Sequence, residues 1–587
     1  MRPRALLPAS LLLLALLHGP AGAWTYGDTL TVIWKPLPNL PTILRPGDTL
    51  EVWAKASSSA TDFSATLKLG PQSFPLAAVA ADWQPSRGWW TLGFRVPQGL
   101  PEDLYDLTLA CGTCPPDTTR HSVKVLQGWK TDFYIAQVTD THLPSGTLSS
   151  DPGFSVSDTS SMADLDAVID DLNLIHPEFI LHTGDIVNEG ELEEYLGMYE
   201  MGRAQAMITR LRDPLYLVSG NHDIGGWDAT PPPPGTSRKD WWRYFGWPAL
   251  ANPPAGFPYH SQVYSFDYSD ILHVVGMEAY NNSGGYDDYL PGIYGANSMT
   301  QEEMNWLASD IATVGQSTLR LAFIHYDFSS QFTNPLALLL DGVIWGHNHS
   351  VSEGNLAAWP FNLGLKSCVY NRAFRIIHVS YGLMQPGPMH FSGGTTGIPT
   401  DSLTVAWSGP NDGTRSRLTA TINNRFGERW SNARLVFNLV DHDSVYAVSG
   451  GTLAQVVRAG GVARVYVACN VPGARTLTVT VTPVLPVAVE PLTNAGLRFD
   501  PPRPNPFRSG TLSLGFALAS AGPVRVGVYD LAGRLVATLF DGRAESGEHM
   551  LVWDGRATVG GHAAAGLYFV RLTSAAGERG TKVVVIR

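Results

Sequence analysis

The sequence predicts a multidomain protein in which one α/β domain stands between all-β domains of the β-sandwich type. The chain has 587 residues, which is enough for about four domains of roughly 100–200 residues each. Polar and apolar residues alternate with the period of a strand toward both ends, whereas strand and helix patterns alternate in the middle. The 59 glycines and 42 prolines are typical of a chain rich in turns and strands.

Residues 1–23 have the features of a secretory signal peptide. Two arginines precede an apolar stretch from Leu6 to Leu17, and Ala21-Gly22-Ala23 supplies the small residues of a cleavage site. This stretch is too short to cross about 30 Å of hydrocarbon, and no later segment is longer, which disfavours a membrane anchor. We therefore expect a mature chain that begins at Trp24, has no transmembrane segment, and is secreted or held at the cell surface.

Residues 24–128 are predicted to form a first β-sandwich. Thr49–Ala54 and Leu104–Leu109 alternate between polar and apolar positions, and no helical period appears between them. Cys111 and Cys114 follow the second of these strands. Such a pair can be a redox centre, half of a zinc site or a structural disulfide, and the flanking strand and turn in an exported chain favour the disulfide. Nothing in the sequence shows whether the other two cysteines pair.

Strands and helices alternate over residues 129–395, which predicts an α/β domain. Near-continuous apolar runs indicate strands buried on both faces, and apolar residues at helical spacing indicate helices between them. The expected strands begin at Phe133, Phe179, Leu215, Leu319 and Gly342, and the expected helices lie near residues 165–172, 191–205 and 300–313.

The remaining chain returns to short alternating strands. Leu418–Ile422 and Thr476–Val481 are examples from residues 396–490, where we expect a second β-sandwich of the Ig-like type. A linker follows, and residues 491–587 are expected to form a last β-domain.

Five short motifs of acidic, imidazole and amide residues lie in the α/β domain, each after a predicted strand. They are Asp140-Thr141-His142, Gly184-Asp185, Gly220-Asn221-His222-Asp223, His325 and Gly346-His347-Asn348-His349. Loops at the carboxyl ends of strands converge on the edge of an open α/β sheet where ligands bind. The side chains gathered there are ligand types for divalent transition metals. Glycines before Asp185, Asn221 and His347 would allow sharp turns and close approach of the backbone.

The order and spacing of these motifs resemble those of the calcineurin-like metallophosphoesterase superfamily, over residues of about 130–395. Each motif alone is weak, but all five in order are specific. The resemblance implies a four-layer αββα sandwich that holds two metal ions and hydrolyses phosphate esters. It assigns one ion to Asp140, His142 and His349, the other to Asn221, His325 and His347, and the bridging position to Asp185.

The resemblance also implies a mechanism. Two divalent or mixed-valence ions of Mn, Fe or Zn would share a hydroxide that attacks the phosphorus. His222, which adjoins a ligand but is not one in the family pattern, is expected to protonate the leaving group, with Asp223 orienting it. Asn188 stands where purple acid phosphatases have a tyrosine, so an Fe(III) charge-transfer site is not expected. A phosphodiester is favoured on family frequency, with phosphomonoesters and nucleotides as alternatives.

The last domain resembles the sorting domains of exported proteins in Bacteroidetes-like bacteria and the related flagellar-hook-assembly Ig-like domain. The matching segments include Asn505-Pro506-Phe507, Tyr529–Arg534 and Gly566–Arg571. The resemblance implies a partner in an export or sorting machinery, whereas a structural end-cap is the alternative.

The overall charge and several other clusters narrow the possible functions. The formal net charge is −12 and no face collects Lys and Arg, so a nucleic-acid-binding surface is not expected. The alternative of a non-catalytic surface-binding protein with a relic phosphoesterase domain is disfavoured, because no ligand position is lost. His182 and His273 are expected to be structural, and the aspartates of 166–171 to form a solvated helix face. The aromatic residues of 241–247 are expected to pack in the core.

Overall fold

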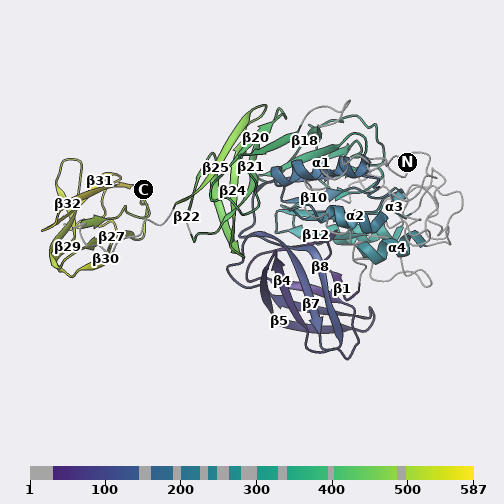
Figure 1. The fold of residues 1–587 in the computed structure, drawn as a ribbon, viewed down its shortest axis with the longest axis horizontal. Helices are drawn as coiled ribbons and strands as arrows, with labels where there is room; N and C mark the ends of the chain where they lie inside the picture. The colour runs from purple at the N-terminus through teal and green to yellow at the C-terminus, as the bar shows by residue number, and fades with distance from the viewer. Residues whose placement is uncertain are drawn as a thin grey trace, which may run out of the picture. The chain divides into compact units, whose positions relative to one another are not determined.

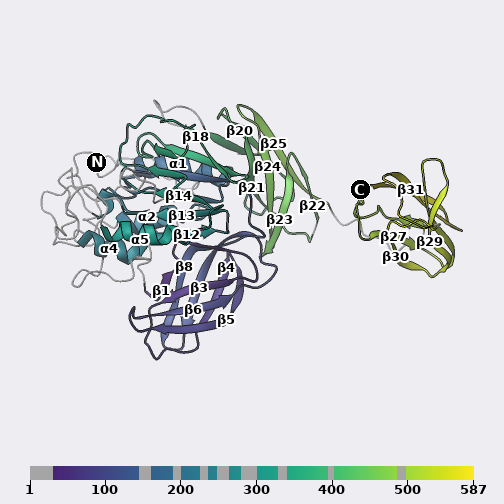
Figure 2. The ribbon, with the colours of Figure 1, turned by 180° about the vertical axis from the view of Figure 1, so that it is seen from behind.

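The computed structural model describes residues 31–587 apart from a set of segments: 144–159, 189–199, 225–235, 247–262, 279–300, 328–339, 394–401, 444, 485–496, 559 and 587. The chain divides into two compact units, residues 1–483 and 484–587 (Figures 1 and 2). The predicted signal peptide, residues 1–23, lies outside the described residues. No helix among the described residues is both long and apolar enough to cross a membrane.

The first unit begins with one eight-stranded sheet in the order β1-β3-β6-β5-β4-β7-β8-β2. Its strand β5 pairs with β4 through residues 72–76 and with β6 through residues 77–84, so a single sheet bends around its core where two separate sheets were expected. Leu50, Leu67, Phe94 and Leu107 lie in this core. The strands are β1 Ile33–Lys35, β2 Thr42–Leu44, β3 Thr49–Ala54, β4 Ser64–Leu69, β5 Gln72–Gln84, β6 Trp89–Arg95, β7 Asp103–Cys111 and β8 Cys114–Val125.

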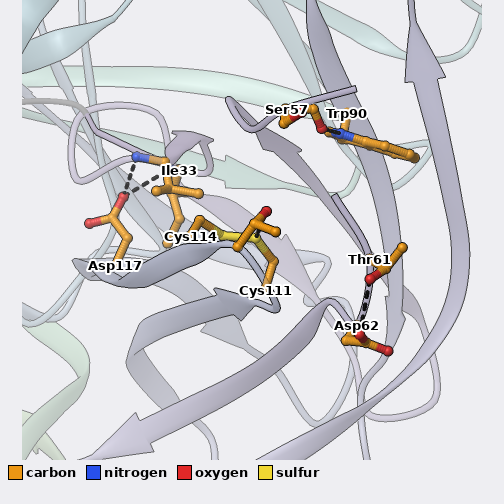
Figure 3. The surroundings of a disulfide bond; sticks show 10 residues. Ile33, Ser57, Thr61, Asp62, Trp90, Cys111, Cys114 and Asp117 are labelled. Atoms are coloured by element: carbon orange, nitrogen blue, oxygen red, sulfur yellow. Dashed lines mark hydrogen bonds between the residues drawn. A yellow bond between two sulfur atoms is a disulfide. The ribbon is translucent and has the colours of Figure 1, made fainter. Parts of the chain in front are cut away.

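Cys111 and Cys114 form the structural disulfide that the sequence favoured, at the tip of the β7–β8 hairpin (Figure 3). On the same hairpin, Oδ2 of Asp117 accepts hydrogen bonds from the backbone N–H groups of Val32 and Ile33 at 2.8 and 2.7 Å. The hairpin therefore anchors the start of β1. The other two cysteines are buried free thiols.

The α/β domain has four layers, as the resemblance implied. One five-stranded sheet has the order β11-β10-β9-β17-β18 and the other β12-β13-β14-β15-β16. Its elements are β9 Asp132–Val138, α1 Ser160–Ile175, β10 Phe179–His182, α2 Glu200–Ile208, β11 Leu215–Leu217, α3 Asn221–Ile224, α4 Thr236–Phe245, β12 Tyr264–Tyr268, β13 Leu272–Gly276, α5 Gln301–Ile311, β14 Leu319–Phe323, β15 Gly342–Trp345, β16 Phe361–Gly364, β17 Ala373–Ser380 and β18 Leu383–Phe391.

Strand β9 shows why these strands are apolar throughout. Phe133 and Ile135 pack into the core between the two sheets, while Ala136 and Val138 pack against α1 and α2 on the outer face. On the far side, α5 covers the second sheet with Leu307 and Ile311. Both faces of each sheet are therefore buried, which removes the polar alternation of a half-exposed strand.

Part of the helix expected near residues 191–205 is present as α2, Glu200–Ile208, and residues 191–199 lie outside the described residues. One expectation for the helices needed correction. The acidic face of α1 is not wholly solvated, because Asp171 is buried and accepts hydrogen bonds from Ser392 Oγ (2.7 Å) and the Leu403 N–H (2.8 Å). This face of α1 packs against the second β-sandwich, which a helical period alone does not reveal. In α4, Trp241 and Phe245 are buried, as expected.

The second β-sandwich pairs a four-stranded sheet, β19-β20-β25-β22, with a three-stranded sheet, β21-β24-β23. Its strands are β19 Leu403–Trp407, β20 Leu418–Asn424, β21 Trp430–Val440, β22 Val445–Ser449, β23 Thr452–Ala459, β24 Val462–Val471 and β25 Thr476–Val484. The second unit is a smaller sandwich of sheets β26-β27-β30 and β29-β28-β31-β32. Its strands are β26 Leu497–Phe499, β27 Leu512–Leu518, β28 Gly522–Tyr529, β29 Leu535–Ala544, β30 Gly547–Trp553, β31 Gly566–Ser574 and β32 Gly577–Val585. The domain boundaries proposed from the sequence stay a prediction.

Candidate metal centre

The motif residues all leave the carboxyl ends of strands, and the structure brings them together. The order is Asp140 after β9, Asp185 after β10, Asn221 after β11, His325 after β14 and His347 after β15. Strands β9, β10 and β11 are parallel, as are β14 and β15. The loops of the two sheets meet where the N–H of His347 donates to Asp140 Oδ2 at 3.0 Å. One edge of the double sheet therefore carries the whole set.

Four of the predicted ligands have a left-handed backbone. The φ angle is +50° at Asp140, +42° at His142, +53° at Asp185 and +66° at His347. This conformation is uncommon for residues other than glycine, and when it persists it clusters at functional sites. The backbone at these residues is therefore held in a conformation of higher energy, which fixes the direction of the four side chains.

The glycines before the ligands act as the sequence suggested. A Cβ added to Gly184 would lie 2.8 Å from the backbone nitrogen of Gly220 and from His325 Nδ1. A Cβ on Gly346 would lie 2.6 Å from Asp140 Oδ2. Side chains are therefore excluded at these positions because the loops approach each other too closely.

Asp140, His142 and His349 form the first group of donor atoms. Nε2 of His349 lies 3.2 Å from Asp140 Oδ1 and 3.1 Å from His142 Nε2. Asp140 and His142 are buried, whereas 41% of the His349 side chain is exposed. The first group therefore opens to solvent on the His349 side.

Asn221, His325 and His347 form the second group. Oδ1 of Asn221 lies 3.1 Å from His325 Nε2 and 3.0 Å from His347 Nδ1. The Nδ1 of His325 lies 2.8 Å from the Thr183 carbonyl oxygen. A hydrogen bond donated from Nδ1 leaves the lone pair of Nε2 free, as a metal-binding histidine requires.

Asp185 lies between the two groups. Its Oδ2 is 3.0 Å from His325 Nε2 in the second group and 3.7 Å from His142 Nε2 in the first. Its Oδ1 accepts a hydrogen bond from the N–H of His222 at 2.9 Å. One carboxylate oxygen thus faces donors of both groups, which is the position predicted for the bridge.

These separations fit metal coordination. Bonds of about 2.0–2.2 Å in tetrahedral or octahedral geometry place neighbouring donor atoms about 3.0–3.6 Å apart. The nitrogens of His142 and His349 are 3.1 Å apart, and those of His325 and His347 are 3.3 Å apart. Paired imidazole nitrogens that converge on buried carboxylates are a donor set for a shared cation.

The electrostatics of the site favour positive charge. Burial alone would raise the pKa of Asp185, but His325 and His222 hold it well below its usual range. Burial would lower the pKa of His325, but the carboxylates of Asp185 and Asp140 raise it to about 9. Two buried carboxylates whose ionisable neighbours are imidazoles are a site where a divalent cation would be stabilised.

The carboxyl group of Asp223 is held by the loops around Asp185. It accepts hydrogen bonds from the backbone N–H groups of Val187 (3.0 Å) and Gly220 (2.7 Å), and burial raises its pKa to about 8. The Nδ1 of His222 lies 2.7 Å from the Asn188 carbonyl oxygen, which orients the ring. The role expected for Asp223 toward His222 stays a prediction.

Several supporting residues were missed by the sequence analysis. Thr139 donates from Oγ1 to Asp140 Oδ2 at 2.7 Å. His182, expected to be structural, is buried under the site, with Nδ1 accepting from the Gly184 N–H at 3.2 Å. The Tyr326 ring packs edge-on against His347 at 4.6 Å between centroids. The position of Thr139 beside Asp140 could have indicated its role. A backbone carbonyl contact such as that of Asn188 cannot be predicted from the residue type, because every residue has a carbonyl group.

Comparison with known families decides the class of this domain. Residues 133–351 match the model of the calcineurin-like phosphoesterase family, and residues 507–578 match that of the FlgD Ig-like domain. Residues 133–351 are a calcineurin-like phosphoesterase domain. This family depends on two metal ions, which agrees with the two groups of donor atoms. The phosphoesterase domain carries every motif residue up to His349.

The similar solved structures are distant. A dimetal phosphatase from Danio rerio is 12% identical, with 44% of this chain and 96% of that chain covered and a TM-score of 0.31. The sulfate thiohydrolase SoxB of Thermus thermophilus is 11% identical, with 44% and 57% covered and a TM-score of 0.28. Dimeric latent PorU from Porphyromonas gingivalis is 16% identical, with 36% and 24% covered and a TM-score of 0.14. No curated protein sequence matched the chain.

Proposed function

We propose that this chain is an exported phosphoesterase that uses two metal ions and acts on phosphodiesters in preference to monoesters. The observation that carries the proposal is the position of Asp185, whose Oδ2 faces His142 on one side and His325 on the other. A carboxylate placed in this way suits a bridge between two ions.

Asp140, His142 and His349 would hold one ion, and Asn221, His325 and His347 the other. When bound, the pair supplies a nucleophile near neutral pH and stabilises charge on the phosphoryl oxygens. The protein's own contribution is orientation: the left-handed backbones, the Thr139 hydroxyl and the Thr183 carbonyl fix where the donor atoms point. The half-exposed His349 marks the side on which a substrate can enter.

We assign His222 to the protonation of the leaving group. It lies among the site histidines, with its ring centroid 4.7 Å from that of His142. Burial lowers the pKa of His222 to about 4, so the free site holds it neutral. The negative charge of a bound phosphate ester would raise that pKa and let the ring carry the proton that it delivers. The contact of Nδ1 with the Asn188 carbonyl oxygen orients the ring within the site.

Export is proposed from the sequence of residues 1–23 and from the C-terminal domain that matches the FlgD Ig-like family. A sorting machinery that reads this domain would be its partner. Expression in a secreting host, followed by N-terminal sequencing of the released chain, tests cleavage before Trp24. Recovery of an uncleaved chain that stays in the cell would contradict export.

The activity is tested with p-nitrophenyl phosphate and bis-p-nitrophenyl phosphate after addition of Mn, Zn or Fe. We expect hydrolysis of both esters, with the higher kcat/KM for the diester, and none by the matched Asp185→Ala variant. A higher kcat/KM for the monoester would overturn the diester preference alone. No hydrolysis of either ester by the metal-loaded wild type would overturn the enzymatic function.

The variant His222→Ala distinguishes two possible roles of His222, a general acid and a metal ligand. We expect this variant to keep both metals and to lose rate by about 10²–10⁴-fold, with the largest loss for esters of poorly acidic leaving groups. Metal content by mass spectrometry is measured beside the rates. Loss of one ion from His222→Ala would make His222 a ligand, which its place near His142 and Asp185 also allows.

A further inference from the structure

A cleft of about 760 Å³ lies at the end of the β11-β10-β9-β17-β18 sheet that is opposite the candidate metal centre. Arg210 and Arg212 line it and stand shortly before β11, whereas Asn221 follows that strand. The remaining walls come from α1, from the β4–β5 and β7–β8 region of the eight-stranded sheet, and from β19, β21 and β24 of the second sandwich. Cavities of about 300–1,000 Å³ are typical of small-molecule sites. The cleft is therefore separate from the phosphoesterase site and large enough for a ligand.

Arginines and carboxylates both line the cleft: Arg210, Arg212, Arg434 and Arg464 with Asp103 and Asp170. Asp166 and Asp213 pair with Arg210 and Arg434 from outside the lining, so the formal charges around the cleft balance. Positive charge within a concave site attracts anions from solution. Any attraction for an anion therefore depends on the arginines that are not engaged in such pairs.

Two of the four arginines are already committed within the fold. Arg210 pairs with Asp166. Arg434 is buried, and its Nη2 lies 3.4 Å from Asp213 Oδ1. These two position the walls of the cleft and leave little capacity for a ligand.

Arg212 and Arg464 are different. Within the part of the chain that the structure describes, neither guanidinium makes a hydrogen bond or an ion pair. Arg464 rests beside the turn at Gly70, with Nη2 3.1 Å from the position of an added Cβ. Partial burial and repulsion by Arg434 lower the pKa of Arg212, against the opposing effect of Asp103 and Asp213. An anion beside Arg212 would offset the repulsion by Arg434, and Arg464 lines the same cleft as a second donor.

The other lining groups suit an organic ligand better than a bare ion. Trp407 offers a half-buried indole, and Asn411 and Asn438 lie on the same wall. Aromatic and amide groups around a few charged donors are the usual lining of a site for a polar organic molecule. We propose that this cleft binds a small organic polyanion, with phosphate or carboxylate groups, through Arg212 and Arg464.

Binding is tested on the full chain by calorimetry, with the phosphoesterase site disabled. Asp185→Asn protein is stripped with EDTA and dialysed into metal-free buffer before titration with inorganic pyrophosphate, citrate or uncharged sucrose. We expect one saturable site for pyrophosphate or citrate and none for sucrose. The tighter of the two anions identifies phosphate or carboxylate as the preferred group. No binding of either anion would overturn the proposal.

Arg212→Gln with Arg464→Gln is the decisive variant. We expect the dissociation constant of the preferred anion to rise at least about tenfold. The matched control is Arg525→Gln, which removes an arginine of the second unit that pairs with Asp541 and should leave binding unchanged. An unchanged constant in the double variant would overturn the proposal. On the Asp185→Asn chain with both arginines intact, the anion should also protect Arg212 and Arg464 from phenylglyoxal, and absence of protection would overturn it independently of folding.

Discussion

Two buried carboxylates near opposite ends of β11 show how the same group serves chemistry in one place and stability in another. Asp213, just before this strand, lies 3.3 Å from Lys124 Nζ and 3.4 Å from Arg434 Nη2. Asp185 lies in the cluster that Asn221 joins just after the strand, and histidines supply its polar side-chain neighbours. Both are fully buried, and their neighbours hold the pKa of each well below its usual range. The two sites differ in the groups that supply positive charge to the carboxylate.

Asp213 is neutralised by permanent cations of the chain itself, so its site is complete. Imidazoles, by contrast, carry a full charge only when protonated, and protonation removes the lone pair that a metal needs. A metal ion would replace the proton that Asp185 and Asp140 stabilise on His325, and the half-exposed His349 leaves a route by which it can enter. The ionisable neighbours of Asp140 and Asp185 are histidines, as a candidate metal centre requires, whereas Asp213 has Lys124 and Arg434 in addition to a histidine, His176.

Asp185→Ala should produce the largest effect because it removes the bridging group. We expect loss of at least one metal ion per chain and of all measurable hydrolysis, with the fold retained since no cation of the chain is left unpaired. Metal content and circular dichroism of the purified variant give both results. Retention of two ions per chain would show that Asp185 does not bridge them.

Asp213→Ala should act on stability and leave the metal centre alone. The substitution leaves Lys124 and Arg434 without this buried partner, and the loss of such a partner costs about 3–5 kcal/mol of unfolding free energy. Chemical denaturation measures the loss, and metal content of the folded variant should match that of the wild type. The control is Asp166→Ala, which breaks the exposed pair with Arg210 and should cost only about 0–1 kcal/mol. Equal losses in the two variants would contradict the distinction.

The sequence predicted that the donor residues of the candidate metal centre would lie together, but it did not predict the link at Asp213. Asp185 lies in a short motif behind a glycine, and all the motifs recur in a fixed order, so local spacing identified them. Asp213 meets Lys124 from the first sheet and Arg434 from the second sandwich, and no local pattern encodes a contact between three domains. The hydrogen bonds that Asp223 accepts from the N–H groups of Val187 and Gly220 were not predicted for the same reason, because folding brings these backbone groups to its carboxyl.

Asp171 is a third buried carboxyl group, and it has neither a cation nor a histidine among its hydrogen-bond partners. Burial raises its pKa to about 7, above its value in the unfolded chain. Its contribution to stability is therefore complete below about pH 3.8 and is lost as the pH rises to about 7. Between pH 5 and 8 the loss is on the order of 2–3 kcal/mol.

Asp171→Asn stays neutral over this range, so its unfolding free energy should fall less than that of the wild type between pH 5 and 8. The measurement is chemical denaturation at both pH values, and the difference between the two chains isolates this residue from the other titrating groups. Parallel pH profiles for the two chains would show that Asp171 is ionised in the folded protein, supported by its two hydrogen bonds alone.

Thr139→Val should produce the smallest effect, because it leaves every ligand in place and removes only the hydroxyl that donates to Asp140 Oδ2. Partners of this kind orient a ligand and are worth about 10–100-fold in metal affinity. Thr141→Val is the matched control, since the Thr141 hydroxyl donates to the Ile186 carbonyl and to no carboxylate. Titration of the stripped proteins with Zn or Mn should therefore separate the two variants. If both bind metal as tightly as the wild type, the hydroxyl of Thr139 only fills space, and orientation of Asp140 rests on its left-handed backbone and on the N–H of His347.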